Sequence, residues 1–120
     1  MGYMDDFFED RISIKQDIMY KVLDRDDSDC QGLFKRANTL LIDKKGMLVE
    51  LKHALEKSDI LLVEIFFEEE CELVKACCEV VSCVDDGNGR FLTRLDFIII
   101  KESYRIFWED FIMKRMEMVI

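Results

Sequence analysis

Proline is absent from the 120 residues, and the chain has only five glycines, one histidine and one tryptophan. With no proline and few glycines, little in the sequence forces turns, and this shortage favours helices. The single histidine, His53, follows Glu50 with the Glu-x-x-His spacing of di-iron bundles, but those sites need two such pairs. We therefore expect no metal and no cofactor, and we interpret His53 as a surface residue. No residue pattern indicates an enzyme.

An excess of basic residues is also missing. Lys and Arg number 17 against 26 Asp and Glu, so the formal net charge is −9. That balance disfavours nucleic acid and anionic membrane surfaces as partners and suits a partner rich in Lys or Arg. No run approaches the roughly 18 apolar residues of a membrane span, and the N-terminus lacks the pattern of a signal peptide. The five cysteines, an odd number without marks of secretion, indicate reduced thiols in a cytoplasm.

Apolar residues are abundant, at 50% of the chain with nine Phe and seven Met, and 36% of residues are charged. No linker or internal repeat divides the chain, so a single domain over residues 1–120 is expected. Apolar spacing typical of helices predicts an all-α fold. The predicted helices span residues 4–24, 30–45, 47–57, 60–84 (in two pieces), 90–100 and 103–120.

The segment 72–100 carries the strongest pattern. Its first part has apolar residues at helical spacing, including Leu73, Cys77 and Val84. An acidic glycine turn follows, and Arg90 then opens a very apolar segment that ends at Ile100. A β-hairpin is the alternative interpretation, because Asn-Gly is a strong hairpin signal and residues 91–97 alternate as a strand would. The helical spacing before the turn favours a helix.

Two short stretches resemble motifs of the Bcl-2 family. Gly87-Asn88-Gly89-Arg90 is similar to the Asn-Trp-Gly-Arg turn of the first homology motif, although the Trp and the first Asn differ. Upstream, Leu33 and Ala37 hold the leucine and small-residue positions of the third motif, with Asn38 in place of its Asp. The second motif and the membrane tail have no counterpart. The resemblance is to a truncated, divergent member of the kind that large DNA viruses such as iridoviruses or poxviruses carry.

This resemblance implies a Bcl-2-like helical bundle with a central apolar helix and a surface groove. The implied function is a viral apoptosis inhibitor that sequesters the homology-3 helix of pro-apoptotic proteins (Bim-like, or Bax or Bak). It would act in the host-cell cytoplasm, with recruitment to the mitochondrial surface through its partners. Arg90 would pair with an aspartate of the partner helix. By position, the groove residues would be Gly89, Arg90, Leu40, Met47, Leu48, Leu51, Cys77, Val81, Thr93 and Phe97.

Several alternatives stay open at this point. A viral bundle of the same shape could instead bind innate immune signalling adaptors, or serve as a structural oligomerisation module. An uncovered apolar stripe over residues 104–119 would favour a homodimer. Arg90 has a local interpretation, neutralisation by Asp85 or Asp86, while Arg94 and Asp96 have no explanation within an apolar helix. Cys77 and Cys78 are interpreted as small core residues, because neither thiol-catalysis nor zinc spacing is present.

Overall fold

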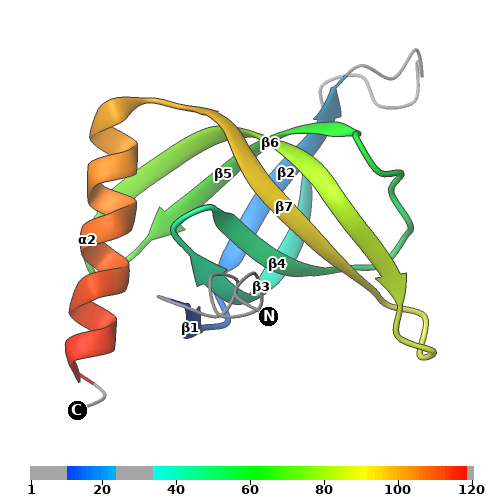
Figure 1. Cartoon of the computed structure of the whole chain (residues 1–120), viewed down its shortest axis with the longest axis horizontal. Coiled ribbons are helices and arrows are strands. Elements are labelled where there is room, and N and C mark those ends of the chain that lie inside the picture. Colours follow the sequence, from blue (N-terminus) through cyan, green and yellow to red (C-terminus); the bar gives the residue numbers. More distant parts are fainter. Residues whose placement is uncertain (1–10, 24–33, 119–120) are drawn as a thin grey trace, which may run out of the picture.

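Seven strands and one helix make up the described structure, a computed structural model that describes residues 11–23 and 34–118 (Figure 1). The strands are β1 (Ile12–Ser13), β2 (Asp17–Leu23), β3 (Lys35–Asp43), β4 (Gly46–Leu51), β5 (Ile60–Phe67), β6 (Glu72–Asp85) and β7 (Phe91–Ile100). The helix α2 (Glu102–Met118) follows β7 directly. The helices predicted over residues 4–24, 30–45, 47–57, 60–84 and 90–100 are therefore wrong wherever the structure describes them. Leu33 lies outside the described residues.

Every strand pairing is antiparallel, in the order β1-β3-β2-β5-β6-β7-β4. An additional pairing joins β4, at one end of this order, to β3, which is next to β1 at the other end, and closes the strands β2 to β7 into a six-stranded barrel. Closure removes the open sheet edges that would otherwise expose unpaired backbone groups. The all-α bundle expected from the sequence is thus contradicted by a closed β-barrel with a C-terminal helix.

Strand β5 shows why these residues form a barrel wall. Leu61, Val63, Ile65 and Phe67 are buried, and the residues between them face outward, a period of two. In β6, Val74, Ala76, Cys78 and Val80 are buried in the same way. Several outward positions are also apolar, and Phe66 is 47% exposed. Apolar residues on both faces hide the alternation, which made the segment look helical.

The β6–β7 connection is a hairpin turn. The Asp86 carboxylate accepts hydrogen bonds from the backbone N–H groups of Asn88 at 2.7 Å and of Arg90 at 3.2 Å. Gly87 and Gly89 have φ angles of 86° and 79°, which glycine adopts without the steric cost of a side chain. The hairpin alternative is therefore correct. Arg90 precedes a strand, and the four residues that resembled a Bcl-2 motif form this turn.

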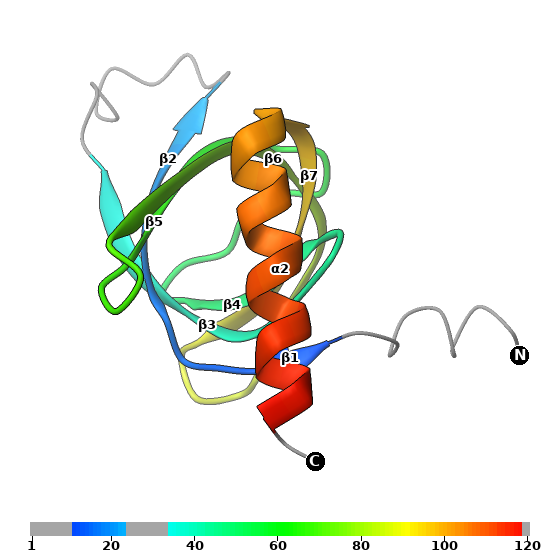
Figure 2. The ribbon, with the colours of Figure 1, turned by 90° about the vertical axis from the view of Figure 1, so that its left-hand side faces the viewer.

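Helix α2 lies across one end of the barrel (Figure 2). Trp108, Phe111 and Ile112 are buried there, and the ring of Phe67 lies 4.6 Å from that of Phe111 between centroids. The ring of Phe97 meets Trp108 edge-on at 5.0 Å. The sequence correctly predicted a C-terminal helix with one apolar stripe. The barrel covers much of that stripe, so the argument for a homodimer based on an exposed stripe fails.

Within residues 11–23 and 34–118, no helix is long and apolar enough to cross a membrane.

Tyr20 provides a stability test of the barrel interior. Its side chain is 2% exposed, its hydroxyl is hydrogen-bonded with His53 Nε2 at 3.1 Å, and burial raises its pKa to about 12 from 10.0. Because the pKa is higher in the folded chain, this contribution to stability is complete below pH 10 and is lost as the pH rises through 12. Relative to Tyr20→Phe, we expect the native protein to lose on the order of 2 kcal/mol over that range, measured by urea denaturation. Identical pH profiles for the two proteins would contradict this.

Candidate functional site

A row of basic side chains crosses the barrel wall where β3, β4 and β7 lie side by side. Glu50 on β4 is paired with Asn38 on β3 and with Leu92 on β7. In an antiparallel sheet, the residues two positions further along each strand form the next row on the same face. Two positions beyond Asn38, Glu50 and Leu92, the next row consists of three cations: Arg36, Lys52 and Arg90. Lys52 and Arg90 each lie one residue past the last paired position of their strand.

The three cations line a surface cleft of about 350 Å³. Arg36 and Lys52 are exposed and Arg90 is half-buried. Within the described part of the chain, no ion pair joins any of the three to a carboxylate. The lining residues are Asp17, Arg36, Ala37, Asn38, Glu50, Lys52 and Arg90. Three cations against two carboxylates make the cleft locally positive in a chain whose net charge is −9.

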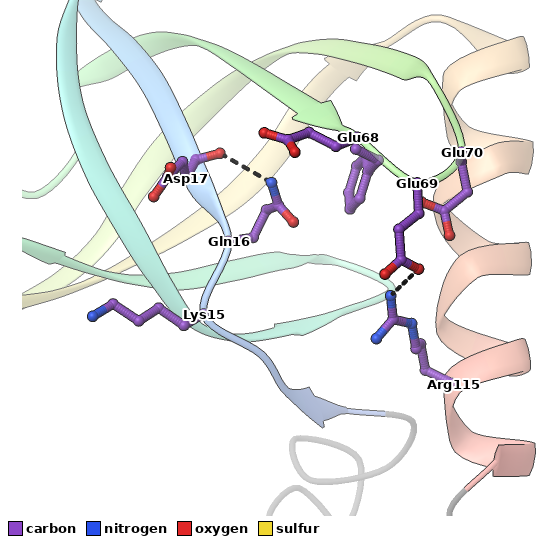
Figure 3. A pocket seen from close by; sticks show the side chains of 8 residues that line it. Lys15, Gln16, Asp17, Glu68, Glu69, Glu70 and Arg115 are labelled. Atoms are coloured by element: carbon purple, nitrogen blue, oxygen red, sulfur yellow. Dashed lines mark hydrogen bonds and ion pairs between the residues drawn. The ribbon is translucent and has the colours of Figure 1, made fainter.

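A second cleft, of about 280 Å³, lies beside α2 and has the opposite electrostatic character (Figure 3). Its lining includes the carboxylates of Asp17 and of residues 68–70, against the cations Lys15 and Arg115. Arg115 is already 3.8 Å from a Glu69 oxygen, and Gln16 Nε2 donates to the Phe66 carbonyl at 2.8 Å. The surplus of carboxylates disfavours anions. Among the described residues, no group of His, Cys, Asp and Glu side chains is arranged to hold a metal ion.

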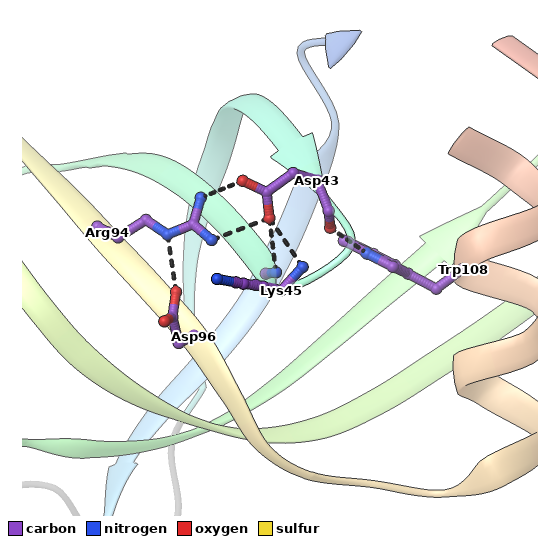
Figure 4. Close-up of polar contacts among 6 residues, drawn as sticks. Asp43, Lys45, Arg94, Asp96 and Trp108 are labelled. Atoms are coloured by element: carbon purple, nitrogen blue, oxygen red, sulfur yellow. Dashed lines mark hydrogen bonds and ion pairs between the residues drawn. The ribbon is translucent and has the colours of Figure 1, made fainter. Parts of the chain in front are cut away.

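Arg94 and Asp96, unexplained by the sequence, belong to a buried ion-pair network (Figure 4). The Arg94 guanidinium, 5% exposed, donates to both carboxylate oxygens of Asp43, at 2.7 and 2.9 Å, and to Asp96 at 2.8 Å. Burial alone lowers the pKa of Arg94, but hydrogen bonds and charge from Asp43 and Asp96 raise it above its ordinary value. Trp108 Nε1 donates to the Asp43 carbonyl at 2.7 Å. The network therefore joins the β3–β4 turn to β7 and α2.

The groove residues expected from the resemblance do not gather on one surface. Met47, Leu51 and Thr93 are buried, whereas Val81 is 39% exposed. Gly89 lies in the exposed hairpin turn, and Phe97 packs against Trp108. The remaining four residues are half-buried. Leu40, Leu48 and Cys77 lie on three different strands, β3, β4 and β6, and Arg90 lines the cationic cleft. A groove beside a central helix has no counterpart, because residues 91–100 form a strand of the barrel.

The cysteines differ in their surroundings. Cys78 is fully buried, and its burial raises the pKa of its thiol to about 12, with the neighbouring Cys77 and Asp96 adding to the effect. A thiol with such a high pKa is a poor nucleophile at neutral pH. Cys77 is half-buried and Cys71 is exposed. For Cys78, the interpretation as a small core residue agrees with the structure.

No known protein-family model matches the sequence, and no curated protein matches it either. Solved structures do match its fold. The inhibitor of motility MotI/DgrA of Bacillus subtilis superimposes with a TM-score of 0.72 at 14% identity, over 88% of this chain and 49% of that one. The PilZ domain of CeSA from a cellulose-synthesizing bacterium superimposes with a TM-score of 0.59 at 12% identity, over 87% of this chain and 95% of that one. The chain spans about half the length of the motility inhibitor.

These similarities define the fold as a PilZ-like β-barrel. The interpretation as a viral Bcl-2 homologue is wrong, and with it the apoptosis-inhibiting function and the pro-apoptotic partners Bim, Bax and Bak. The interpretation failed because both motif matches lie in local structures that are not helical. Gly87–Arg90 is a hairpin turn, and Ala37 and Asn38 lie on strand β3 rather than on a helix. Apart from Arg90, the cations of the cleft were missed, because only strand register brings positions 36 and 52 next to position 90.

Proposed function

We propose that this chain is a PilZ-like binding domain with a regulatory rather than catalytic role, and that the cationic cleft binds a phosphodiester-bearing nucleotide. The observation that carries the proposal is the row of Arg36, Lys52 and Arg90, for which no described carboxylate acts as an ion-pair partner. Unpaired cations side by side repel one another, and a bound anion relieves that repulsion. The similarity to an inhibitor and to a PilZ domain supports a role in binding.

The chemistry of the row suits phosphate groups. An arginine guanidinium donates two parallel hydrogen bonds to phosphate oxygens, and a lysine adds a mobile point charge. Neighbouring strands lie about 4.8 Å apart, so the two arginines at the ends of the row are separated by roughly 10 Å across the sheet. That separation allows a nucleotide with two phosphodiesters to contact both ends. Cyclic di-GMP is therefore the first ligand to test.

Isothermal titration with cyclic di-GMP, GMP and inorganic phosphate tests the proposal on the whole chain. We expect cyclic di-GMP to bind most tightly, and its affinity to fall as salt screens the cleft. Arg36→Ala and Arg90→Ala should each weaken binding about tenfold or more, since a hydrogen bond to a charged group contributes about 1.5–3 kcal/mol. Lys57→Ala, an exposed lysine outside the cleft, is the matched control and should bind as the native protein does.

Two results would overturn the proposal. One is the absence of binding by all three anions at concentrations up to about 1 mM, which corresponds to roughly 4 kcal/mol of binding free energy. The other is binding that Arg36→Ala, Arg90→Ala and Lys57→Ala reduce equally, because that pattern reflects overall charge and not the cleft. Far-UV circular dichroism of each variant verifies that its barrel is folded.

A further inference from the structure

Strand β7 continues past the strand that pairs with it. Its pairing with β4 ends at Asp96, opposite Gly46, whereas its pairing with β6 continues to Ile100. Beyond that point, the Phe97 N–H donates to the Lys45 carbonyl at 2.8 Å. In the described strand order, no strand lies beside Ile98–Ile100 on the β4 side. This end of β7 is therefore a short sheet edge.

A groove of about 270 Å³ runs along this edge. Phe97 and Ile100 line it from β7, Lys44 and Lys45 from the β3–β4 turn, and Arg105 from α2. The sixth lining residue, Asp96, already accepts a hydrogen bond from the buried Arg94. The groove thus combines a strand edge, apolar side chains and two lysines, because the Arg105 guanidinium is already paired with Glu102 and Glu109. Figure 4 shows Lys45 in the β3–β4 turn and Asp96 on β7.

The apolar surface continues on β7 itself. Ile98 is 49% exposed and Ile99 is 68% exposed. Folded proteins usually shield a strand edge by making it short, by placing charges on it or by covering it. Here Lys44 and Lys45 lie in the neighbouring β3–β4 turn, whereas the strand edge itself carries exposed isoleucines. This arrangement favours the addition of another strand, because no charge on the edge itself prevents it.

We propose that this edge groove binds an extended segment of a partner protein that carries both acidic and apolar side chains. The segment would add a strand to β7, so that its backbone pairs with Ile98–Ile100. Its carboxylates would face Lys44 and Lys45, and its apolar side chains would cover the exposed isoleucines. Charge complementarity of this kind fixes which segments are accepted and speeds their association.

This surface is separate from the nucleotide cleft. The groove lies at the Gly46 end of β4 and the cationic cleft at its Leu51 end, and a strand of six residues spans about 20 Å. The two proposals therefore fail independently, because substitutions at one end leave the lining of the other unchanged.

Fluorescence anisotropy with a fluorescein-labelled peptide of alternating valine and aspartate tests the groove. We expect Lys44→Glu combined with Lys45→Glu to weaken binding of this peptide at least about tenfold, as loss of electrostatic complementarity does elsewhere. The matched control is Arg36→Glu combined with Lys52→Glu, which changes the net charge by the same amount at the other end of β4. That control should bind the peptide as the native protein does. The same peptide with N-methylated backbone amides should bind at least about tenfold more weakly, because it cannot form strand hydrogen bonds.

Hydrogen exchange locates the bound peptide. The amides of Ile98–Ile100 should exchange more slowly when the peptide is present, and those of the β6–β7 turn should not change. Equal binding of the methylated peptide would overturn the proposal. A loss of binding in the Arg36/Lys52 control alone would also overturn it. The same holds if the free protein self-associates in sedimentation velocity and its Ile98–Ile100 amides are already protected without the peptide.

Discussion

Replacing Trp108 with alanine is expected to lower the free energy of unfolding by about 3–5 kcal/mol, the usual cost of removing a large buried aromatic side chain. Trp108 is fully buried, and its ring lies 5.0 Å from that of Phe97 and 6.1 Å from that of Phe67. Its indole N–H also donates to the Asp43 carbonyl at 2.7 Å. One side chain thereby joins α2 to the barrel wall and to the β3–β4 turn.

Urea denaturation followed by circular dichroism measures this effect, since the substitution removes the only tryptophan. Trp108→Phe retains an aromatic ring but leaves the Asp43 carbonyl without its donor, so we expect an intermediate loss of about 1–3 kcal/mol. Ile106 lies on the same helix and is 56% exposed, so Ile106→Ala is the control and should change stability by roughly 0.5 kcal/mol or less. A loss below about 1 kcal/mol for Trp108→Ala would mean that α2 is not packed on the barrel.

Two elements follow from the sequence by ordinary rules. The apolar spacing of Tyr104, Trp108 and Phe111 predicts the C-terminal helix, and α2 spans Glu102–Met118. The Asn88-Gly89 pair indicates a hairpin, which forms between β6 and β7. Both signals are local, and both need only the residues within a few positions of each other.

The strands between these elements were hidden by two physical features. The outer wall keeps apolar residues such as Leu62 and Phe66, so a period of two does not stand out. The barrel also makes turns in which residues other than glycine and proline hold the turn conformation. Ser58 and Cys71 adopt positive φ angles of 78° and 55°, and Asp43 caps its turn by accepting from the Lys45 and Gly46 amides. A shortage of proline and glycine was therefore a misleading argument for helices.

The candidate cleft depends on long-range register. Arg90 was singled out from the sequence, but for a pairing with a helix that the barrel excludes. Arg36 and Lys52 are 16 positions apart, and Lys52 and Arg90 are 38 positions apart, so no short motif contains all three. Only the pairing of β3 with β4 and of β4 with β7 places the three side by side. Binding sites on β-barrels are difficult to predict from sequence for this reason.

Asp43→Ala should be as damaging as the loss of Trp108, with an expected cost of about 3–5 kcal/mol. The substitution removes the buried carboxylate partner of Arg94, which is 5% exposed, and leaves the partly exposed Asp96 as a partner. It also removes the acceptor for the backbone amides of Lys45 and Gly46, at 2.9 and 3.0 Å. A buried charge that loses its partner retains the full cost of its desolvation. Removing one member of such a pair therefore destabilises a protein more than replacing both members with apolar residues.

The double variant Asp43→Leu with Arg94→Met separates these contributions. It removes both charges and fills the space with apolar groups, so it should be more stable than Asp43→Ala, by at least about 1 kcal/mol in urea denaturation. Asp96→Asn retains a polar partner for Arg94 at a position whose side chain is 37% exposed, and it should cost roughly 1 kcal/mol or less. If the double variant were as unstable as Asp43→Ala, the damage would lie in the turn amides rather than in the orphaned charge. The ion pair would then specify how the β3–β4 turn meets β7 without stabilising the barrel.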